Sequence, residues 1–321
     1  MATYTALTLA EARALGREFG LDVARAEGLA AGSVNSNVAL VLADGGRAFL
    51  RVYEEQDLAG ARSEAALLLH LAGAGLAVAP PIARVDGEGW VTAHAGKPVA
   101  VFPWIDGEIR CQRGVSANDT HRVGTMLARI HAAGSPTPRE GRFTVARLDE
   151  RCEAIARSTD ADLAAMAPTL RALLDDVAAR RTEDAPRGLC HGDLFRDNVL
   201  FRGEEIAAVL DFESAADGPF AFDLAVTILA WCVGDDLDLA LARALVDGYR
   251  SVRAIEPATA RALFVEARLA ALRFTITRIT DYAMRAHLGA NVPRDWRRFW
   301  MRHERLVALG DRALRDALAL A

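Results

Sequence analysis

The strongest constraint on the fold is a change of residue pattern close to Trp104. Before it, four short runs rich in β-branched and aromatic residues are bounded by turn-forming residues, a pattern that predicts β-strands. These runs are Asn37–Leu42, Arg47–Tyr53, Gly89–Thr92 and Val99–Trp104. Residues 43–46 contain two glycines, which tolerate the positive φ of a tight turn, so the first two runs are predicted to form a hairpin.

Helix-start signals are also present in both parts of the chain. Thr8 and Glu11 have the spacing of a capping box, in which each residue satisfies a backbone N–H of the other. A helical apolar stripe follows at Arg62–Leu71. Ser116 and Asp119 repeat the start signal shortly after the change of pattern.

The remainder of the chain has a helical period. Alanine-rich segments cover Ala146–Arg181 and Leu237–Leu320, on either side of a β-like island at Gly188–Phe212. A chain of 321 residues exceeds the usual size of a single hydrophobic core. We therefore predict an α+β fold with two lobes, a β-rich N-terminal lobe of residues 1–104 and a helical C-terminal lobe of residues 105–321.

Composition excludes several classes of protein. Hydrophobic residues make up 52% and charged residues 25% of the chain, the balance of a compact soluble protein. The net charge of −5 provides no positive field for nucleic acid or anionic membranes. The longest uncharged stretch, Ala65–Ala83, holds two prolines and two glycines, which disfavours a membrane span. No secretory signal is visible, so we expect a cytoplasmic protein with reduced cysteines.

The island Gly188–Phe212 carries the residues suited to chemistry. Asp193 and Asn198 lie five positions apart in a His-x-Asp-x-x-x-x-Asn pattern, and an apolar run then ends at Asp211. This arrangement is typical of phosphoryl transfer, in which Asp193 would accept or orient the hydroxyl proton. Asn198 and Asp211 supply the hard oxygen ligands that hold Mg²⁺ against nucleotide phosphates. The pattern predicts an ATP-dependent kinase with a small-molecule alcohol as its substrate.

Each of these residues has a plainer interpretation. Asp and Asn commonly cap loops and end strands, so Asp193, Asn198 or Asp211 alone would indicate little. Their joint occurrence at kinase spacing favours the catalytic interpretation. His191 is expected to brace the loop by hydrogen bonding rather than to act in catalysis.

The local sequence resembles the aminoglycoside phosphotransferase and choline kinase superfamily, which has the protein-kinase-like fold. The resemblance is carried by His191-Gly-Asp193 with Asn198, by Leu210-Asp211-Phe212 and by Phe222-Asp223-Leu224-Ala225. It implies that Asp223 anchors the catalytic loop from the following helix. The alternative, an Asp that interacts with the helix dipole, is compatible with that role.

Longer segments resemble the bacterial homoserine kinases within this superfamily. They are Gly32–Asn37, Leu194–Val199, Asp223–Cys232, Gly248–Arg253, Ala271–Phe274 and Thr277-Arg278. The resemblance implies transfer of the ATP γ-phosphoryl group to L-homoserine, a step of threonine biosynthesis. It also implies that the first lobe binds nucleotide and that the second carries catalysis and substrate binding.

Two departures from the kinase pattern concern the first lobe. A Ser/Asn-rich loop replaces the usual glycine-rich one, and Ser33, Asn35 and Asn37 are the candidates to contact phosphates; an ordinary polar turn is the alternative. Arg51 occupies the position where the superfamily often has a phosphate-contacting Lys, and Arg also pairs with phosphate. Glu64 is its expected ion-pair partner, with an exposed helix acid as the alternative.

Two more arginines are candidates in the second lobe. Arg196 lies inside the catalytic loop, where it would neutralise the γ-phosphate or form a surface salt bridge. A helix expected over Ala262–Ala286 places Arg273, Thr277 and Asp281 on one face. That face would either grip both charged groups of an amino acid or form a solvated, ion-paired surface.

Other functions stay open at this point. An aminoglycoside, choline or another amino alcohol could be the acceptor on the same fold. A nucleotide-binding pseudokinase is the alternative of another class, since Arg51 stands in the lysine position. The oligomeric state has no signal in the sequence.

Overall fold

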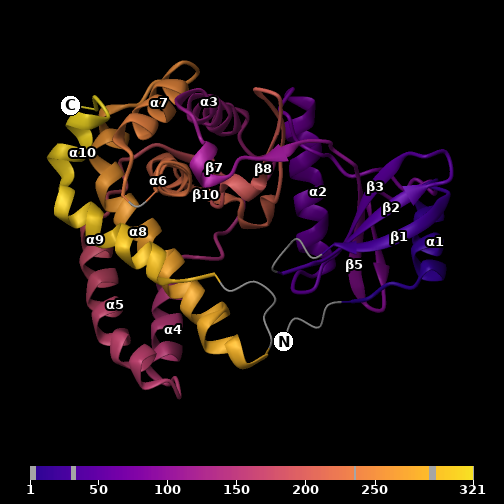
Figure 1. Ribbon diagram of the computed structural model, residues 1–321, viewed down its shortest axis with the longest axis horizontal. Coiled ribbons are helices and arrows are strands. Elements are labelled where there is room, and N and C mark those ends of the chain that lie inside the picture. The colour runs from indigo at the N-terminus through magenta and orange to yellow at the C-terminus, as the bar shows by residue number, and fades with distance from the viewer. Residues whose placement is uncertain (1–4, 30–33, 235, 289–293, 321) are drawn as a thin grey trace. The chain divides into compact units, whose positions relative to one another are not determined.

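The computed structural model describes residues 5–29, 34–234, 236–288 and 294–320. The chain forms two compact units (Figure 1). The first comprises Met1–Gly107 with Ala207–Leu210, and the second comprises Glu108–Ile206 with Asp211–Ala321.

The first unit is built on a five-stranded sheet with the order β1-β2-β3-β5-β4. Its strands are β1 (Val23–Leu29), β2 (Ser36–Leu42), β3 (Arg47–Val52), β4 (Val91–His94) and β5 (Lys97–Pro103). Neighbouring strands pair antiparallel, and the predicted hairpin of β2 and β3 is confirmed. The sequence patterns do not predict β1. It is an edge strand in which only Val23 is buried, so its charged residues face outward and hide the strand signal.

Helices α1 (Leu9–Glu18) and α2 (Leu58–Gly73) complete the first unit. The predicted capping box of α1 is confirmed, because Thr8 Oγ1 accepts the Glu11 N–H at 3.3 Å and the Glu11 carboxylate accepts the Thr8 N–H at 2.8 Å. The apolar face of α1 packs on buried residues of the sheet. Helix α2 begins four residues before the predicted start, at the N-cap Asp57.

The second unit is mainly helical, as the sequence predicts (Figure 1). Its α-helices are α3 (Ala117–Ala133), α4 (Val145–Ala156), α5 (Ala161–Arg180), α6 (Phe220–Trp231), α7 (Leu239–Arg250), α8 (Pro257–Asp281), α9 (Arg297–Leu309) and α10 (Asp311–Ala317). Short 3₁₀ turns are η1 (Gln112–Gly114), η2 (Arg196–Asn198), η3 (Phe212–Ser214) and η4 (Ala283–Leu288). The expected helix Ala262–Ala286 is therefore misplaced by about one turn, because Pro257 opens it and Asp281 ends it.

Short strands frame the island that carries the candidate catalytic residues. Strands β7 (Arg187–Cys190) and β10 (Ala216–Pro219) pair antiparallel. A three-stranded sheet has the order β6 (Glu108–Ile109), β8 (Val199–Arg202), β9 (Glu205–Val209). The loop between β7 and β8 therefore emerges from one small sheet and enters another, which fixes both of its ends.

Two close contacts hold helix α3 against helix α7. A Cβ added at Gly124 would lie 1.9 Å from the carbonyl oxygen of Leu245, and one at Gly248 would lie 1.9 Å from that of His121. No side chain fits at either position, so the two glycines allow the helix backbones to touch. This contact brings Tyr249 of α7 beside His131 at the end of α3.

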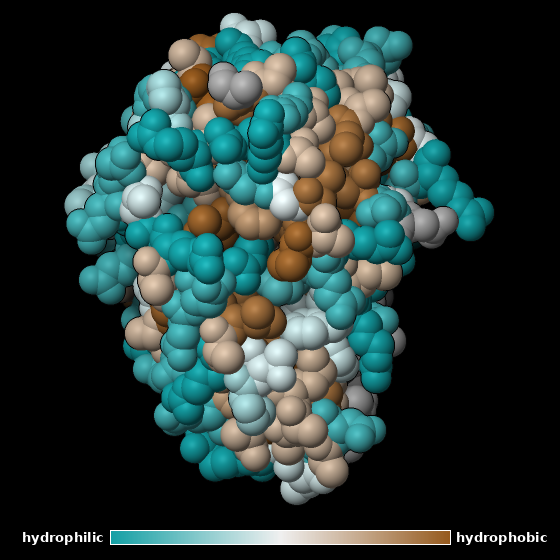
Figure 2. Space-filling view, turned by 90° about the vertical axis from the view of Figure 1, so that its left-hand side faces the viewer, coloured by the Kyte–Doolittle hydropathy of each residue, from teal (hydrophilic) through white to brown (hydrophobic). Residues whose placement is uncertain are grey.

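Buried apolar residues of α4, α5 and α8 form a core cluster of the second unit, which includes Leu148, Leu170, Leu174, Leu272 and Ile276. Hydrophilic residues cover much of the face seen in Figure 2, and hydrophobic ones gather there in smaller patches. Among the described residues, no helix has the length and apolar character to cross a membrane.

Candidate active site

The loop between β7 and β8 requires glycine at Gly192. Its φ is +73°, and a Cβ there would lie 2.9 Å from the carbonyl oxygen of Ser214. Other residues would therefore be strained by the backbone conformation and blocked by the backbone of η3. Gly192 therefore determines the direction in which the chain runs from β7 to Asp193.

Asp223, in the first turn of α6, holds this loop by its backbone. Its carboxylate accepts the His191 N–H at 2.6 Å and the Gly192 N–H at 2.8 Å. The group is fully buried, which opposes ionisation, but the hydrogen bonds from His131 and Gly192 outweigh burial and lower the pKa of Asp223. An ionised carboxylate thus fixes two successive amides immediately before Asp193.

His131 completes this buried network, and the sequence analysis does not identify it. Its Nε2 lies 3.0 Å from Asp223 Oδ2, and its Nδ1 lies 2.8 Å from the Tyr249 hydroxyl. Burial lowers the pKa of His131, and the bond to Asp223 opposes that shift only in part. A lone histidine on the apolar stripe of a helix carries no sequence signal for this role.

Asp193 and Asn198 lie side by side in the loop. The Asn198 amide nitrogen donates to the Asp193 carbonyl at 2.8 Å and approaches its carboxylate at 3.4 Å. Burial raises the pKa of Asp193, the charge of Asp211 adds to this, and Arg273 opposes it. A half-buried carboxylate with a raised pKa is suited to accept a proton.

Asp211 lies two residues after β9, at the start of η3, and its backbone is in the left-handed region with φ 62° and ψ 68°. A non-glycine residue there stores backbone strain, which tends to occur at functional positions. Its carboxylate has no hydrogen-bond partner among the described residues. Because the Asn198 amide nitrogen is already bonded, its amide oxygen stays available, and this oxygen and the Asp211 carboxylate are hard donors of the kind that Mg²⁺ prefers.

His191 braces the loop in the manner expected from the sequence. Its side chain is fully buried and packs on Phe212, with ring centroids 4.6 Å apart. Its Nδ1 accepts the backbone N–H of Asp193 at 3.2 Å. The ring therefore supports the backbone of Asp193.

Arg273 lies beneath the loop rather than on a solvated face. The side chain is 3% exposed, and its guanidinium donates to the carbonyl oxygen of Gly192. It stacks on Phe143 and Phe274, with the guanidinium carbon 4.1 Å and 4.2 Å from the two ring centroids. The interpretation of a solvated, ion-paired face is therefore wrong for Arg273, whereas Asp281 does pair with Arg151 at 2.5 Å.

Arg196 turns away from solvent. Its guanidinium donates to the Ala230 carbonyl at 3.0 Å and to Gln112 at 3.4 Å. It forms no ion pair with the described residues, so the surface salt bridge is not found. Neutralisation of the γ-phosphate by Arg196 stays a prediction.

The candidate nucleotide-binding residues lie in the first unit. Arg51 of β3 and Glu64 of α2 form an ion pair at 3.5 Å, with Glu64 only 2% exposed, so the exposed-acid alternative is wrong. Asn37 of β2 pairs directly with Arg51 across the sheet, which puts both side chains on one face. Asn35 accepts the Glu54 N–H at 3.2 Å and joins the start of β2 to the end of β3. Ser33 lies outside the described residues.

One further cluster contains metal-ligand side chains. Ligand atoms of His131, Cys190 and Asp223 lie within 4.8 Å of one another, all buried. The first and third already share a hydrogen bond, and the Cys190 thiol donates to the Pro219 carbonyl at 3.5 Å. Burial raises the pKa of Cys190 well above its ordinary value, so the thiol stays protonated. The cluster is a hydrogen-bonded core.

Comparison with known proteins shows which family this chain resembles. Residues 25–255 match the phosphotransferase enzyme family. The chain is 34% identical over 318 residues to a homoserine kinase of Methylocella silvestris, with 97% of this chain and 98% of that protein covered. It is 36% identical over 285 residues to a homoserine kinase of Methylobacterium radiotolerans, with 85% of each chain covered.

Solved structures show the same fold at low sequence identity. An amicoumacin kinase has a TM-score of 0.69 at 16% identity, over 95% of this chain and 93% of that chain. A spectinomycin phosphotransferase has a TM-score of 0.67 at 13% identity, over 98% and 99%.

The chain therefore belongs to the phosphotransferase enzyme family. The predicted α+β, protein-kinase-like fold and the resemblance to homoserine kinases are both confirmed.

Proposed function

We propose that this protein is an ATP-dependent kinase that phosphorylates the side-chain hydroxyl of L-homoserine. The observation that carries the proposal is the grouping of Asp193, Asn198 and Asp211 in one unit, with Asp193 and Asn198 in direct contact. Relatives named homoserine kinase, 31–36% identical over most of the chain, support the choice of acceptor.

The proposed reaction gives each of these groups one role. Asp193 orients the acceptor hydroxyl and takes its proton as the oxygen attacks the γ-phosphorus. A bond forms between that oxygen and phosphorus, while the bond from phosphorus to the β,γ-bridging oxygen breaks and ADP leaves. Asn198 and Asp211 would hold Mg²⁺, which, when bound, neutralises charge on the phosphates. Arg51 of the first unit is proposed to contact phosphates of ATP.

Preorganisation of Asp193 supports fast transfer. Hydrogen bonds from the amides of His191 and Gly192 to Asp223 hold the preceding backbone, and Arg273 holds the Gly192 carbonyl. The rate of phosphoryl transfer depends on alignment, so a rigid loop contributes directly to it. Arg196 is proposed as a further cation near the transferred phosphoryl group. For the protein as a whole, we propose a cytoplasmic location.

The test is a kinase assay with a panel of acceptors. ADP release should be measured with L-homoserine, L-serine, choline and kanamycin, with Asp193→Asn as the background. We expect the highest kcat/KM for L-homoserine, because the hydroxyl of L-serine lies one methylene short and choline lacks the carboxylate.

Two results would contradict the proposal. A choline or kanamycin rate well above that of L-homoserine would overturn the acceptor but leave the kinase standing. No turnover with any alcohol would favour a nucleotide-binding pseudokinase.

A further inference from the structure

Two arginine side chains lie against an aromatic cluster next to the catalytic loop. The rings of Phe195 and Phe274 lie 4.9 Å apart, and those of Phe274 and Phe299 lie 4.7 Å apart. The guanidinium carbons of Arg278 and Arg302 lie 4.5 Å and 4.2 Å from the centroid of Phe299. Both guanidinium groups therefore contact the same ring.

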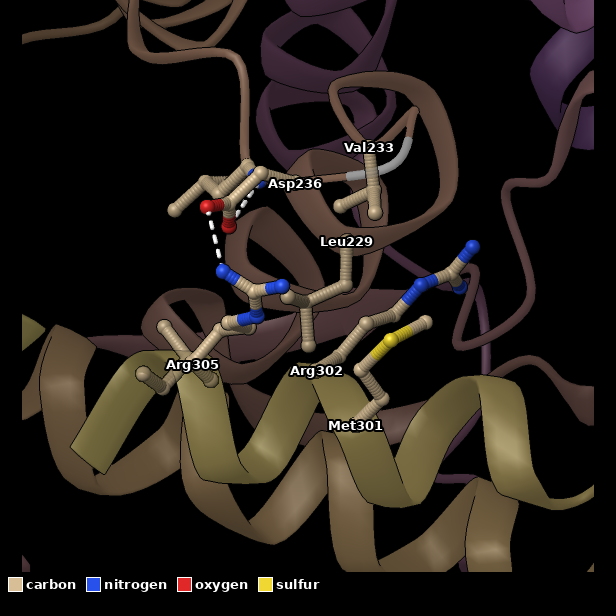
Figure 3. Close-up of a pocket in the computed structure, with 8 residues that line it drawn as sticks. Leu229, Val233, Asp236, Met301, Arg302 and Arg305 are labelled. Carbon is tan, nitrogen blue, oxygen red and sulfur yellow. Dashed lines mark hydrogen bonds and ion pairs between the residues drawn. The ribbon is translucent and has the colours of Figure 1, made fainter. Parts of the chain in front are cut away.

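Arg302 is a buried cation that has no counter-ion among the described residues. Its side chain is 9% exposed, and it forms no hydrogen bond or ion pair with the described residues. Arg305, one turn later on α9, pairs with Asp236 at 2.8 Å. Figure 3 shows the Arg305 guanidinium directed at Asp236 and that of Arg302 directed away from it. Asp236, the acidic residue that lines the pocket drawn in Figure 3, is thus already paired with another arginine.

Two of the three nitrogen atoms of the Arg278 guanidinium group have no hydrogen-bond acceptor among the described residues. Its Nη1 donates to the Asp295 carbonyl at 3.0 Å, while Nε and Nη2 make no hydrogen bond to the described residues. Burial lowers the pKa of Arg278, and the positive charge of Arg294 adds to the effect. Burial and the charge of Arg278 likewise lower the pKa of Arg302. Like charges that are buried close together cost free energy, and a bound anion would recover part of it.

The cluster faces the proposed reaction centre. Phe195, two residues after Asp193, packs on Phe299 with ring centroids 5.8 Å apart, and Phe299 carries Arg278. The negative charge of Asp193 also raises the pKa of Arg278, against the larger effect of burial. An acceptor whose hydroxyl lies at Asp193 would therefore extend toward the donors of Arg278.

We propose that Arg278 binds the α-carboxylate of the amino acid acceptor through Nε and Nη2, and that Arg302 is a positioning residue that adds positive potential behind it. This inference rests on the proposed homoserine kinase function. A carboxylate matches a planar guanidinium fork with two parallel hydrogen bonds. Asn198 and Asp211 serve the metal and phosphates, so the acceptor carboxylate is the anion that still needs a cation.

The test compares two acceptors that differ only by the carboxylate. 3-Amino-1-propanol has the ammonium, chain length and hydroxyl of L-homoserine but no carboxylate. We expect the wild type to prefer L-homoserine by about a thousandfold in kcat/KM. Arg278→Gln should lose about a hundredfold with L-homoserine and should leave 3-amino-1-propanol and the KM for ATP unchanged.

Arg302→Gln and Arg305→Gln form a matched pair on α9. Arg302→Gln should raise the KM for L-homoserine several-fold with kcat unchanged, and should not alter the KM for 3-amino-1-propanol. Arg305→Gln should behave as wild type with both. Arg278→Lys, which keeps the charge without the fork, should recover part of the loss, and thermal unfolding checks that every variant folds.

The outcomes separate this inference from the proposed function. Equal losses with both acceptors, or a raised KM for ATP, would overturn the assignment of Arg278 while homoserine kinase activity stands. If the wild type phosphorylates neither acceptor, the proposed function fails. In that case, calorimetry with L-homoserine tests the carboxylate site by itself. Binding to the wild type that is lost in Arg278→Gln would support the assignment of Arg278. No binding of L-homoserine to the wild type would overturn it.

Discussion

The carboxylate of Asp223 accepts a hydrogen bond of 2.8 Å from the backbone N–H of Gly192. The two residues lie 31 positions apart in the chain, on α6 and on the loop that carries Asp193. One side chain in a helix thus holds the backbone of the candidate catalytic loop. Both stability and turnover should therefore depend on it.

Asp223→Asn is expected to lower the free energy of unfolding by about 3 kcal/mol, because an amide N–H₂ would face backbone donors in a buried site. It should also lower kcat at least about a hundredfold through displacement of Asp193. Urea unfolding and the ADP assay measure the two effects. Asp316→Asn, at an exposed position on α10, is the control, and a variant equal to it would contradict the anchoring role.

Acidification should weaken the fold through His131. The pKa of His131 is lowered from its ordinary value of 6.5, so the folded protein holds it neutral while the unfolded chain takes up a proton below pH 6.5. The contribution of neutral His131 to the free energy of unfolding is therefore complete above pH 6.5. It falls as the pH decreases below that value, by up to about 1.4 kcal/mol per pH unit. The lowered pKa of Asp223 acts in the same direction below 3.8.

Urea unfolding between pH 7 and pH 5 measures this dependence. His131→Gln should flatten the profile in that range. His121→Gln, at an exposed position on the same helix, should keep the wild-type slope. A profile of His131→Gln as steep as that of the wild type would exclude His131 as the cause.

Arg51→Ala is expected to weaken ATP binding at least about tenfold and to spare adenosine, because the guanidinium is assigned to phosphates. Arg47→Ala, on the same strand but exposed and paired with Asp106, is the matched control. Glu64→Ala should be milder and non-additive with Arg51→Ala. Calorimetry with both ligands provides the comparison, and equal losses for ATP and adenosine would show that Arg51 is misassigned.

Asp211→Ala should abolish the part of ATP binding that depends on Mg²⁺, because it deletes a carboxylate ligand. ATP titrations with and without Mg²⁺ should converge for the variant and differ for the wild type. Since Asp211 has a positive φ, Asp211→Asn keeps a residue that tolerates this conformation and separates ligand loss from strain. A full Mg²⁺ effect in both variants would argue against Asp211 as a ligand.

Gly124→Ala should destabilise the protein by about 3 kcal/mol, since the added Cβ would meet the Leu245 carbonyl and force α3 from α7. Gly73→Ala, in α2 with no atom within 4 Å of the added Cβ, is the control and should raise stability by up to about 1 kcal/mol. Urea unfolding tests the pair. Equal stability of the two variants would mean that the helices separate at no cost.

Local patterns in the sequence were sufficient for much of the fold. The capping box of Thr8 and Glu11 and the hairpin of β2 and β3 depend on residues a few positions apart, so short-range sterics and hydrogen bonds decide them. The spacing of Asp193 and Asn198 is of the same kind, because one loop brings them together. The edge strand β1 was missed, since pairing and not its own residues makes it a strand.

Only the tertiary structure decided which distant groups share a site. His131 and Asp223 lie 92 positions apart, and no pattern within either helix predicts their contact. The sequence places Arg273 and Arg278 on one helix, but packing puts Arg273 beneath the loop and leaves Nε and Nη2 of Arg278 without a hydrogen bond to the described residues. Local propensities act over a few residues, whereas burial and the pairing of charges depend on the packing of helices that the chain brings together from far apart.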